Sequence, residues 1–275
     1  MPDRALVIVP TYNERPNLEG LVRGIREQDC GVLVVDDNSP DGTGEVADQL
    51  AVTDSGVQVL HRRGKLGLGS AYIAGLSRGL ERGFDLLITM DADGSHQPRH
   101  LPALIAAAGR RRGVVIGSRY VPGGAIVGWP QRRMLLSHGA NLYCRTLLSI
   151  RVHDCTSGYR CYPREAVEHL HLESIVSDGY AFLIETLYRC LRLGIPVTEV
   201  PIRFEDRVAG RSKVSATEIG KALFLVPRLR WGRARASRAR RRSPLSDDEI
   251  DLPGAPVYRG AASHQATREP GREGH

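Results

Sequence analysis

The stretch that decides the fold is LLITMDADGSHQP, residues 86–98, in which an apolar run ends abruptly in two aspartates. The run Leu86–Met90 is typical of a buried strand. In an extended segment residues i and i+2 point the same way, so Asp91 and Asp93 are expected to converge at the strand exit. Two like charges held that close repel each other unless a cation lies between them. Because hard carboxylate oxygens suit Mg²⁺ or Mn²⁺, the stretch predicts a divalent-metal site.

Apolar runs of strand length alternate with segments of helical spacing through the first 120 residues. The other expected strands are Ala5–Val9, Val32–Val35, Val57–Leu60 and Val114–Gly117. Between them, residues 18–25 and 71–80 carry apolar side chains at the spacing of one helix face. This alternation predicts an α/β fold, a Rossmann-like and mostly parallel central sheet flanked by helices. In such sheets ligands bind beyond the carboxyl ends of the strands.

Polar residues follow four of the expected strands. The first strand exits into PTYNE (10–14), the second into DDNSPDGT (36–43), the fourth into DADGS (91–95) and the fifth into SRY (118–120). Capping or turn chemistry explains any one of these exits. Four polar exits along a single sheet edge favour a binding site there.

The chain changes character after residue 120. Residues 121–132 are rich in Gly and Pro and are expected to form a mobile loop, and a helix is expected over Arg133–Ser149. A second helix is expected over Tyr180–Leu193, with Tyr180 and Phe182 in the core. A strand is expected over Val197–Phe204. A short apolar helix over Thr217–Val226 is expected to stop at Pro227.

Composition limits the class of protein. With 275 residues and 41% apolar content, the chain allows one large α/β domain with appendages, or two small domains. It contains no apolar run of membrane-spanning length, and the run at Ala5–Val9 is too short for a signal peptide. The five cysteines are scattered without C-x-x-C spacing, which favours a reduced, cytoplasmic setting without structural zinc.

The positive charge lies in one tail. The net charge is +7, and residues 228–242 hold eight arginines and no acidic residue, so the rest has 30 basic against 31 acidic residues. Such a cluster seeks a phosphate-rich surface, either nucleic acid or anionic lipid. Apolar residues within 217–231 followed by these arginines are typical of an interfacial membrane anchor. The alternative is an apolar segment that caps the core and a solvated tail. From about Ser243 the composition is typical of disorder.

These motifs together resemble those of the family 2 inverting glycosyltransferases with the GT-A fold, and among them the polyprenol-phosphate (dolichol-phosphate) mannose synthases. The matching segments run in order from residue 7 to residue 213: VIVPTYNERPNL, VVDDNSPDGT, KLGLGSAY, MDADGSHQP, GSRY, GWPQRRMLLSHGAN, DCTSGYRCY, DGYAFLIE and VPIRFEDRVAGRSK. The D-x-D element alone indicates only a broad superfamily. DADGSH together with DCTSGYR and FEDRVAGRSK is much more specific.

The resemblance implies a GDP-mannose donor and a polyprenyl monophosphate acceptor. It implies a metal site at Asp91 and Asp93, with Ser95 as a further ligand or outer partner. The implied nucleotide pocket contains Pro10, Tyr12, Glu14, Asp36, Asp37, Lys65, Gly67 and Ala92. The implied phosphate or acceptor contacts are Arg119, Arg132, Arg133, Arg207 and Lys213. Asp91, Asp93 and Arg119 are the expected catalytic residues.

No general base is evident in the sequence. An acceptor phosphomonoester is already anionic at neutral pH, so positioning and charge stabilisation can be sufficient. Asp154 is either a base or a turn residue that orients Arg160. The rival readings are a polyprenyl-phosphate glucosyl or other hexosyl transferase using a UDP-sugar, a nucleic-acid binder, and a non-catalytic sugar-nucleotide module. A dehydrogenase is disfavoured because no G-x-G-x-x-G follows the first strand.

The resemblance also implies an organisation and a location. The catalytic domain is expected to span residues 1–227, with an arginine-rich, disordered tail over 228–275. The chain resembles the short family members without transmembrane helices, which are peripheral. We therefore expect it on the cytoplasmic face of a membrane and not on nucleic acid. A membrane-anchoring protein partner is left open.

Overall fold

A seven-stranded sheet forms the centre of the molecule, which the computed structural model describes over residues 4–175, 177–206, 220 and 223–231. The strands are β1 (Ala5–Thr11), β2 (Gly31–Asp36), β3 (Val57–His61), β4 (Leu86–Thr89), β5 (Val114–Ser118), β6 (Ala125–Val127), β7 (Arg160–Pro163), β8 (Val197–Pro201) and β9 (Arg203–Glu205). The main sheet has the order β3-β2-β1-β4-β7-β5-β8, and β6 pairs with β9 separately. Only β7 runs antiparallel to its neighbours, so the predicted α/β architecture is confirmed.

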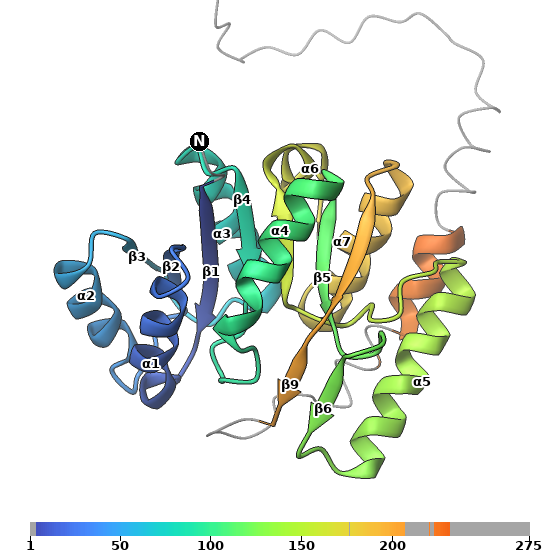
Figure 1. Ribbon diagram of the computed structural model, residues 1–275, viewed down its shortest axis with the longest axis horizontal. Helices are drawn as coiled ribbons and strands as arrows, with labels where there is room; N and C mark the ends of the chain where they lie inside the picture. Colours follow the sequence, from blue (N-terminus) through green and yellow to red (C-terminus); the bar gives the residue numbers. More distant parts are fainter. Residues whose placement is uncertain (1–3, 176, 207–219, 221–222, 232–275) are drawn as a thin grey trace, which may run out of the picture.

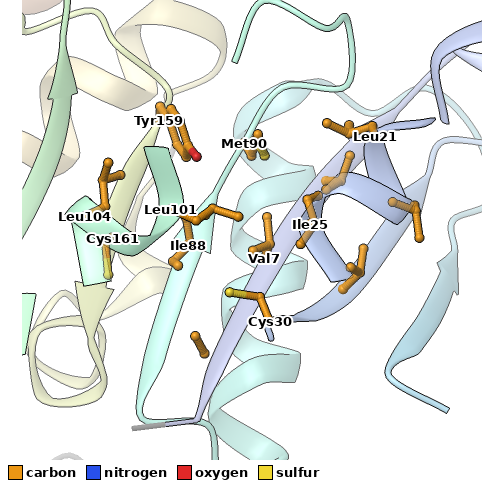
Figure 2. Close-up of a cluster of buried hydrophobic side chains, with 14 of the residues drawn as sticks. Val7, Leu21, Ile25, Cys30, Ile88, Met90, Leu101, Leu104, Tyr159 and Cys161 are labelled. Carbon is orange, nitrogen blue, oxygen red and sulfur yellow. The ribbon is translucent and has the colours of Figure 1, made fainter. Parts of the chain in front are cut away.

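Helices cover both faces of the main sheet (Figure 1). They are α1 (Arg15–Arg26), α2 (Thr43–Thr53), α3 (Leu68–Glu81), α4 (Leu101–Arg111), α5 (Gln131–Leu148), α6 (Arg164–His169) and α7 (Gly179–Arg192), with 3₁₀ turns η1 (Pro98–His100) and η2 (Leu172–Ser174). Successive side chains of β1 point to opposite faces. Val7 and Val9 pack with α1 and α4, whereas Leu6 and Ile8 pack with α3 and α7. Figure 2 shows the first of these two clusters.

Helix α3 lies unusually close to the sheet because glycines face it. A Cβ atom on Gly75 would lie 2.2 Å from Ile8 Cγ2, and one on Gly79 would lie 2.1 Å from Leu87 Cδ2. Neither position therefore accepts a side chain without displacing the helix. The close approach holds the N-terminal turns of α3, including Tyr72, beside the end of β4.

Most of the elements expected from the sequence are present, and the differences have local causes. The expected strand over Val197–Phe204 is broken at Ile202, because β9 leaves the main sheet and pairs with β6 inside the Gly/Pro-rich loop. Helices α2 and α4 and strand β7 were not singled out by the sequence analysis. In β7 the apolar pattern is masked by Arg160, whose fully buried guanidinium donates to backbone carbonyls, among them those of Ser157 and Leu183.

The expected stop at Pro227 is wrong, because residues 223–231 are helical through the proline. Proline has no N–H to donate to the carbonyl four residues earlier. Here that carbonyl, on Leu223, accepts a 3.0 Å hydrogen bond from Tyr143 Oη of α5 instead. The helical segment crosses the domain boundary expected at residue 227. Among the described residues, no helix has the length and apolarity needed to cross a membrane.

Candidate active site

A cleft of about 360 Å³ opens beyond the carboxyl ends of the parallel strands. Its volume lies in the range of small-molecule sites. The structure brings most of the expected site residues into its walls, namely Pro10, Tyr12, Glu14, Asp37, Lys65, Gly67, Asp91, Ala92, Asp93, Arg119 and Arg133. They come from the exits of β1, β2, β4 and β5, the loop before α3 and the first turn of α5. The polar residues that follow the strands therefore lie at the cleft, as the sequence predicted.

Asp91 is held at both its backbone and its side chain. Its Oδ1 accepts a 2.7 Å hydrogen bond from Tyr72 Oη, and its backbone N–H donates to His96 Nδ1 at 3.0 Å. Burial, together with the Asp91 carboxylate, raises the pKa of Tyr72 well above its usual value, so the phenol remains a donor. Burial lowers the pKa of His96 despite the nearby aspartates. These contacts fix the Asp91 carboxylate at the cleft wall.

Asp93 lies in a tight turn whose geometry Ser95 sets. Its Oδ1 accepts from the backbone N–H of Ser95 at 3.1 Å and from Ser95 Oγ. Ser95 is fully buried and does not line the cleft, so the structure places it as a partner of Asp93. The described residues contain no group of three or more His, Cys, Asp or Glu side chains suited to a metal. Two carboxylates facing a ligand cleft nevertheless fit Mg²⁺ or Mn²⁺, which complete their coordination with water and substrate phosphate.

The structure separates the roles of the two aspartates at the end of β2. Asp36 is buried and accepts from Thr11 Oγ1 at 2.9 Å and from Ser39 Oγ at 2.6 Å, so it braces the loops. Asp37 lines the cleft, pairs with Arg62 Nη1 at 2.7 Å and accepts from the Leu66 N–H. Burial raises the pKa of Asp37 more than Arg62 lowers it.

The loop before α3 closes one end of the cleft. The Lys65 ammonium lies 4.4 Å from the centre of the Tyr12 ring. Gly67 has a φ of +98°, and a Cβ there would lie 2.2 Å from an Asp178 carboxylate oxygen. Asp178 Oδ1 in turn accepts from the Gly69 N–H at 2.6 Å, at the start of α3. Gly67 thus allows Asp178 to join this loop to the start of α7.

Arg119 enters the cleft as part of a buried ion pair with Asp154. Its Nε and Nη2 lie 2.7 and 2.6 Å from the two carboxylate oxygens, a bidentate geometry. Burial alone would raise the pKa of Asp154, but the charge and hydrogen bonds of Arg119 hold it below its usual value. Burial alone would lower the pKa of Arg119, but the charge and hydrogen bonds of Asp154 raise it above its usual value. The expectation that Asp154 orients Arg160 finds no hydrogen bond in support, since Asp154 orients Arg119.

Aromatic rings surround the two arginines that line the cleft. The guanidinium carbons of Arg119 and Arg133 lie 5.5 and 3.9 Å from the Trp129 ring centre, and Phe204 meets that ring edge-on. Arg133 also pairs with Asp206 at 3.0 Å. Arg132 is exposed and does not line the cleft. Arg207 and Lys213 lie outside the described residues.

The sequence analysis missed several wall residues. Tyr180, expected in the core, packs against it and also lines the cleft, and Phe182 is buried as expected. Trp129 and Asp178 also line the cleft, and both stand inside motifs quoted for the resemblance, in GWPQRR and DGYAFLIE. Membership in those motifs was the available signal, but only the structure shows which motif positions face the cleft.

A carboxylate pair and arginines in a cleft at the edge of a mostly parallel sheet define a GT-A-like glycosyltransferase. Residues 6–171 match the glycosyl transferase family 2, so the chain belongs to this family. It is 49% identical over 241 residues to the polyprenol monophosphomannose synthase of Mycolicibacterium smegmatis, covering 86% of this chain and 90% of that one. It is 48% identical over 233 residues to the undecaprenyl-phosphate mannosyltransferase of Micrococcus luteus, covering 84% and 95%.

Solved structures share the fold at low identity. Glucosyl-3-phosphoglycerate synthase from Mycobacterium tuberculosis, in complex with phosphoglyceric acid, superposes with a TM-score of 0.59 and 22% identity. The superposition covers 84% of this chain and 80% of that one. The same enzyme with Mn²⁺, uridine diphosphate and phosphoglyceric acid gives 0.59 at 23% identity, covering 84% and 78%. This similarity supports the GT-A-like architecture.

Proposed function

We propose that this chain transfers mannose from GDP-mannose to a polyprenyl monophosphate with inversion, giving a polyprenyl β-mannosyl phosphate. One observation carries the proposal: two groups suited to two different phosphate moieties line a single cleft. Asp91 and Asp93 suit a metal-bound diphosphate, and Arg119 and Arg133 suit a second phosphate. The mannosyltransferase names of two relatives at 49% and 48% identity support mannose and a prenyl phosphate acceptor.

The donor half of the cleft accounts for departure of the nucleotide. Asp91 and Asp93 would hold Mg²⁺ or Mn²⁺, which when bound offsets the charge that develops on the leaving diphosphate. The Tyr12 ring and the Lys65 ammonium offer a face and a charge to the nucleoside diphosphate. Asp37, Glu14, Pro10 and Ala92 also line the cleft.

The acceptor half accounts for attack without a general base. A phosphomonoester has a second pKa near 6, so its oxygen is anionic at neutral pH and needs orientation rather than deprotonation. Arg119, held by Asp154, and Arg133, held against Trp129, would bind that phosphate. Arg207 and Lys213 are proposed as further contacts. Direct displacement at the anomeric carbon of an α-linked donor gives a β-linked product.

The lipid acceptor also determines where the enzyme works. We place it peripherally on the cytoplasmic face of a membrane, because residues 228–242 carry eight arginines and anionic lipid attracts such clusters. A membrane-anchoring protein is a second candidate contact. We assign catalysis to the part of the chain before the arginine-rich tail.

The test is transfer of radiolabelled mannose from GDP-mannose to polyprenyl phosphate, by wild type and Asp93→Ala, with Mg²⁺, Mn²⁺ or EDTA. Label that enters the organic phase, and that EDTA and the substitution both abolish, supports the reaction and the metal role. Absence of transfer with either metal and with vesicles present contradicts the proposal. Asp48→Asn, an exposed carboxylate substitution on α2, is the matched control and is expected to retain activity.

The second candidate is a polyprenyl-phosphate glucosyl or other hexosyl transferase that uses a UDP-sugar. The carboxylate pair and the arginines serve that reaction equally, because sugar identity depends on a few hydrogen bonds. UDP-glucose offered beside GDP-mannose in the same assay distinguishes the two. Preference for UDP-glucose would replace the mannosyl assignment and leave the lipid acceptor in place.

A further inference from the structure

We infer that the outward face of α5, together with the exposed side chains of helical residues 223–231, docks the protein onto an anionic lipid bilayer. The inference rests on the proposed lipid acceptor and deepens it by naming the surface that meets the membrane. The sequence pointed only to the segment around 217–231 and its arginines. It gave no indication that α5, in the middle of the chain, contributes to the same surface.

Exposed large apolar side chains concentrate on these two segments. Of the eleven such side chains among the described residues, six lie here: Leu135, Leu136 and Leu142 on α5, and Leu223, Phe224 and Trp231 beyond it. Leu135 is 73% exposed, Leu142 is 63% exposed and Phe224 is 83% exposed. Single exposed apolar residues are ordinary on protein surfaces, but contiguous patches mark interaction sites.

The two segments form one surface. In Figure 1, α5 (light green) and the orange helical segment lie side by side at the end of the molecule away from α2. Tyr143 Oη donates to the Leu223 carbonyl, and Val226 packs with Cys144 and Leu148 of α5 in one buried cluster. Because Pro227 cannot satisfy that carbonyl, the Tyr143 contact stabilises this helix against α5.

Helix α5 exposes apolar side chains on its outward side as well as packing its inward side against the protein. Asn141, Cys144 and Leu148 face the interior. Arg132, Leu135, Gly139, Leu142 and Thr146 follow one another at i+3 and i+4 and are all exposed, so they form one outward stripe. Leu135 and Leu142 of this stripe, with Leu136 beside it, leave apolar surface exposed that is suited to a further contact.

The charge of this surface favours anionic lipid over neutral lipid or a basic partner. Residues 131–148 contain no Asp or Glu, and neither do residues 220–242. They carry Arg132, Arg133 and Arg145 on α5 and Arg228 and Arg230 on the described helical segment, and the sequence continues with six more arginines up to Arg242. Apolar side chains flanked by basic residues are suited to the boundary between acyl chains and anionic headgroups.

The same surface adjoins the cleft that must receive a lipid phosphate. The outward stripe begins at Arg132, and the next residue, Arg133, lines the cleft beside Trp129. A bilayer against α5 would therefore present a membrane-embedded phosphate to the mouth of the cleft. The prenyl chain would stay in the acyl layer, so the protein needs no tunnel for it.

The test is flotation of the full chain with vesicles of phosphatidylcholine alone or with 30% phosphatidylglycerol added, without donor or acceptor. The key variant is Leu135→Glu/Leu142→Glu, and the matched control is Val52→Glu/Leu193→Glu, where the native side chains are 87% and 52% exposed. We expect the α5 variant to lower partitioning onto anionic vesicles at least about tenfold. The control should stay within about twofold of wild type on the same scale.

Equal vesicle binding by wild type and the α5 variant would overturn the inference. Absence of wild-type binding to anionic vesicles would also overturn it and would favour a protein partner for this face. Circular dichroism and thermal melting of each variant establish that it is folded. Because no acceptor is present, these outcomes do not depend on the proposed reaction. That reaction is tested separately with a water-soluble, short-chain prenyl phosphate, on which the α5 variant should keep wild-type turnover.

A fluorescence measurement gives a second readout on the same face. The chain has two tryptophans, so Trp129→Phe leaves Trp231 as the only one. Brominated lipids quench an indole that enters the acyl region, and we expect them to quench Trp231 on binding. Unquenched emission from a vesicle-bound protein would place the contact elsewhere.

Discussion

Arg119 and Asp154 form a bidentate ion pair in which Nε and Nη2 lie 2.7 and 2.6 Å from the two carboxylate oxygens, with both side chains buried. The backbone N–H of Arg119 donates to the same carboxylate at 3.0 Å. Asp154 therefore fixes both the chain and the side chain of a residue that faces the cleft. This arrangement assigns Asp154 a positioning role. Both of its carboxylate oxygens accept hydrogen bonds from Arg119, which does not fit a general base that takes a proton from the substrate.

Asp154→Asn should lower both stability and activity. Removing one charge of a buried pair costs about 3–5 kcal/mol, because the other charge remains buried and uncompensated. We expect the unfolding free energy to fall by about that amount, and turnover to fall with an increase in the KM for the lipid phosphate. Denaturant titration and steady-state kinetics measure the two effects. If Asp154 were instead the catalytic base, turnover would collapse with no change in acceptor KM.

The same pair predicts a pH dependence. The folded pKa of Asp154 lies below its usual value, so its contribution to stability is fully present above the unfolded pKa of about 3.9. The contribution is lost as the pH falls through the folded pKa. The stability difference between wild type and Asp154→Asn should therefore be largest near pH 7 and shrink below about pH 4. If the stability difference between wild type and Asp154→Asn grew as the pH fell, the pKa of Asp154 would be raised in the folded protein rather than lowered.

Tyr72→Phe should weaken metal binding without disturbing the fold. The hydroxyl donates to Asp91 Oδ1 at 2.7 Å and fixes that carboxylate, while the ring packs on Phe182 and remains in the variant. Loss of a partner that orients a metal ligand typically costs about 10–100-fold in affinity. Titration of Mn²⁺ in the presence of GDP, followed by electron paramagnetic resonance, measures it. Tyr162→Phe, at a buried tyrosine outside the cleft, is the control and should leave Mn²⁺ affinity unchanged.

The sequence predicted the parts of the fold and site that depend on local pattern. The apolar runs located β1 to β5, and the polar exits located the cleft, because strand direction in a parallel sheet brings the exits together. Contacts between segments that are far apart in the sequence could not be predicted from local pattern. The sequence left Asp154 open between a base and a turn residue that orients Arg160, and it did not indicate the observed partner Arg119, which is 35 residues away. Pro227 gave a false stop because the Leu223 carbonyl that it leaves unpaired accepts from Tyr143, 80 residues before Leu223.

Trp129→Phe and Trp129→Ala should show whether an aromatic ring at this position is needed to hold Arg133 for binding of the lipid phosphate. Arg133 lies 3.9 Å from the ring centre, and a cation over an aromatic face gains about 0.5–1 kcal/mol or more. We expect phenylalanine to keep most of this contact and alanine to release Arg133. The KM for polyprenyl phosphate should rise several-fold in the alanine variant only. The KM for GDP-mannose should change in neither. A rise confined to the donor KM would move Trp129 to the nucleotide side.

Asp36→Asn and Asp37→Asn should differ although the residues are adjacent. Asp36 is turned into the loops, where it accepts from Thr11 and Ser39, so its loss should lower the unfolding free energy by about 1–3 kcal/mol. Asp37 lines the cleft and pairs with Arg62, so its loss should raise the KM for the sugar nucleotide about tenfold or more. It should also lower the unfolding free energy, because the largely buried Arg62 charge loses its partner. Thermal melts of both variants measure the stability change, and steady-state kinetics measure the KM for the sugar nucleotide. A donor KM raised by the Asp36 substitution alone, in a fully folded protein, would reverse the assignment and make Asp36 the nucleoside contact.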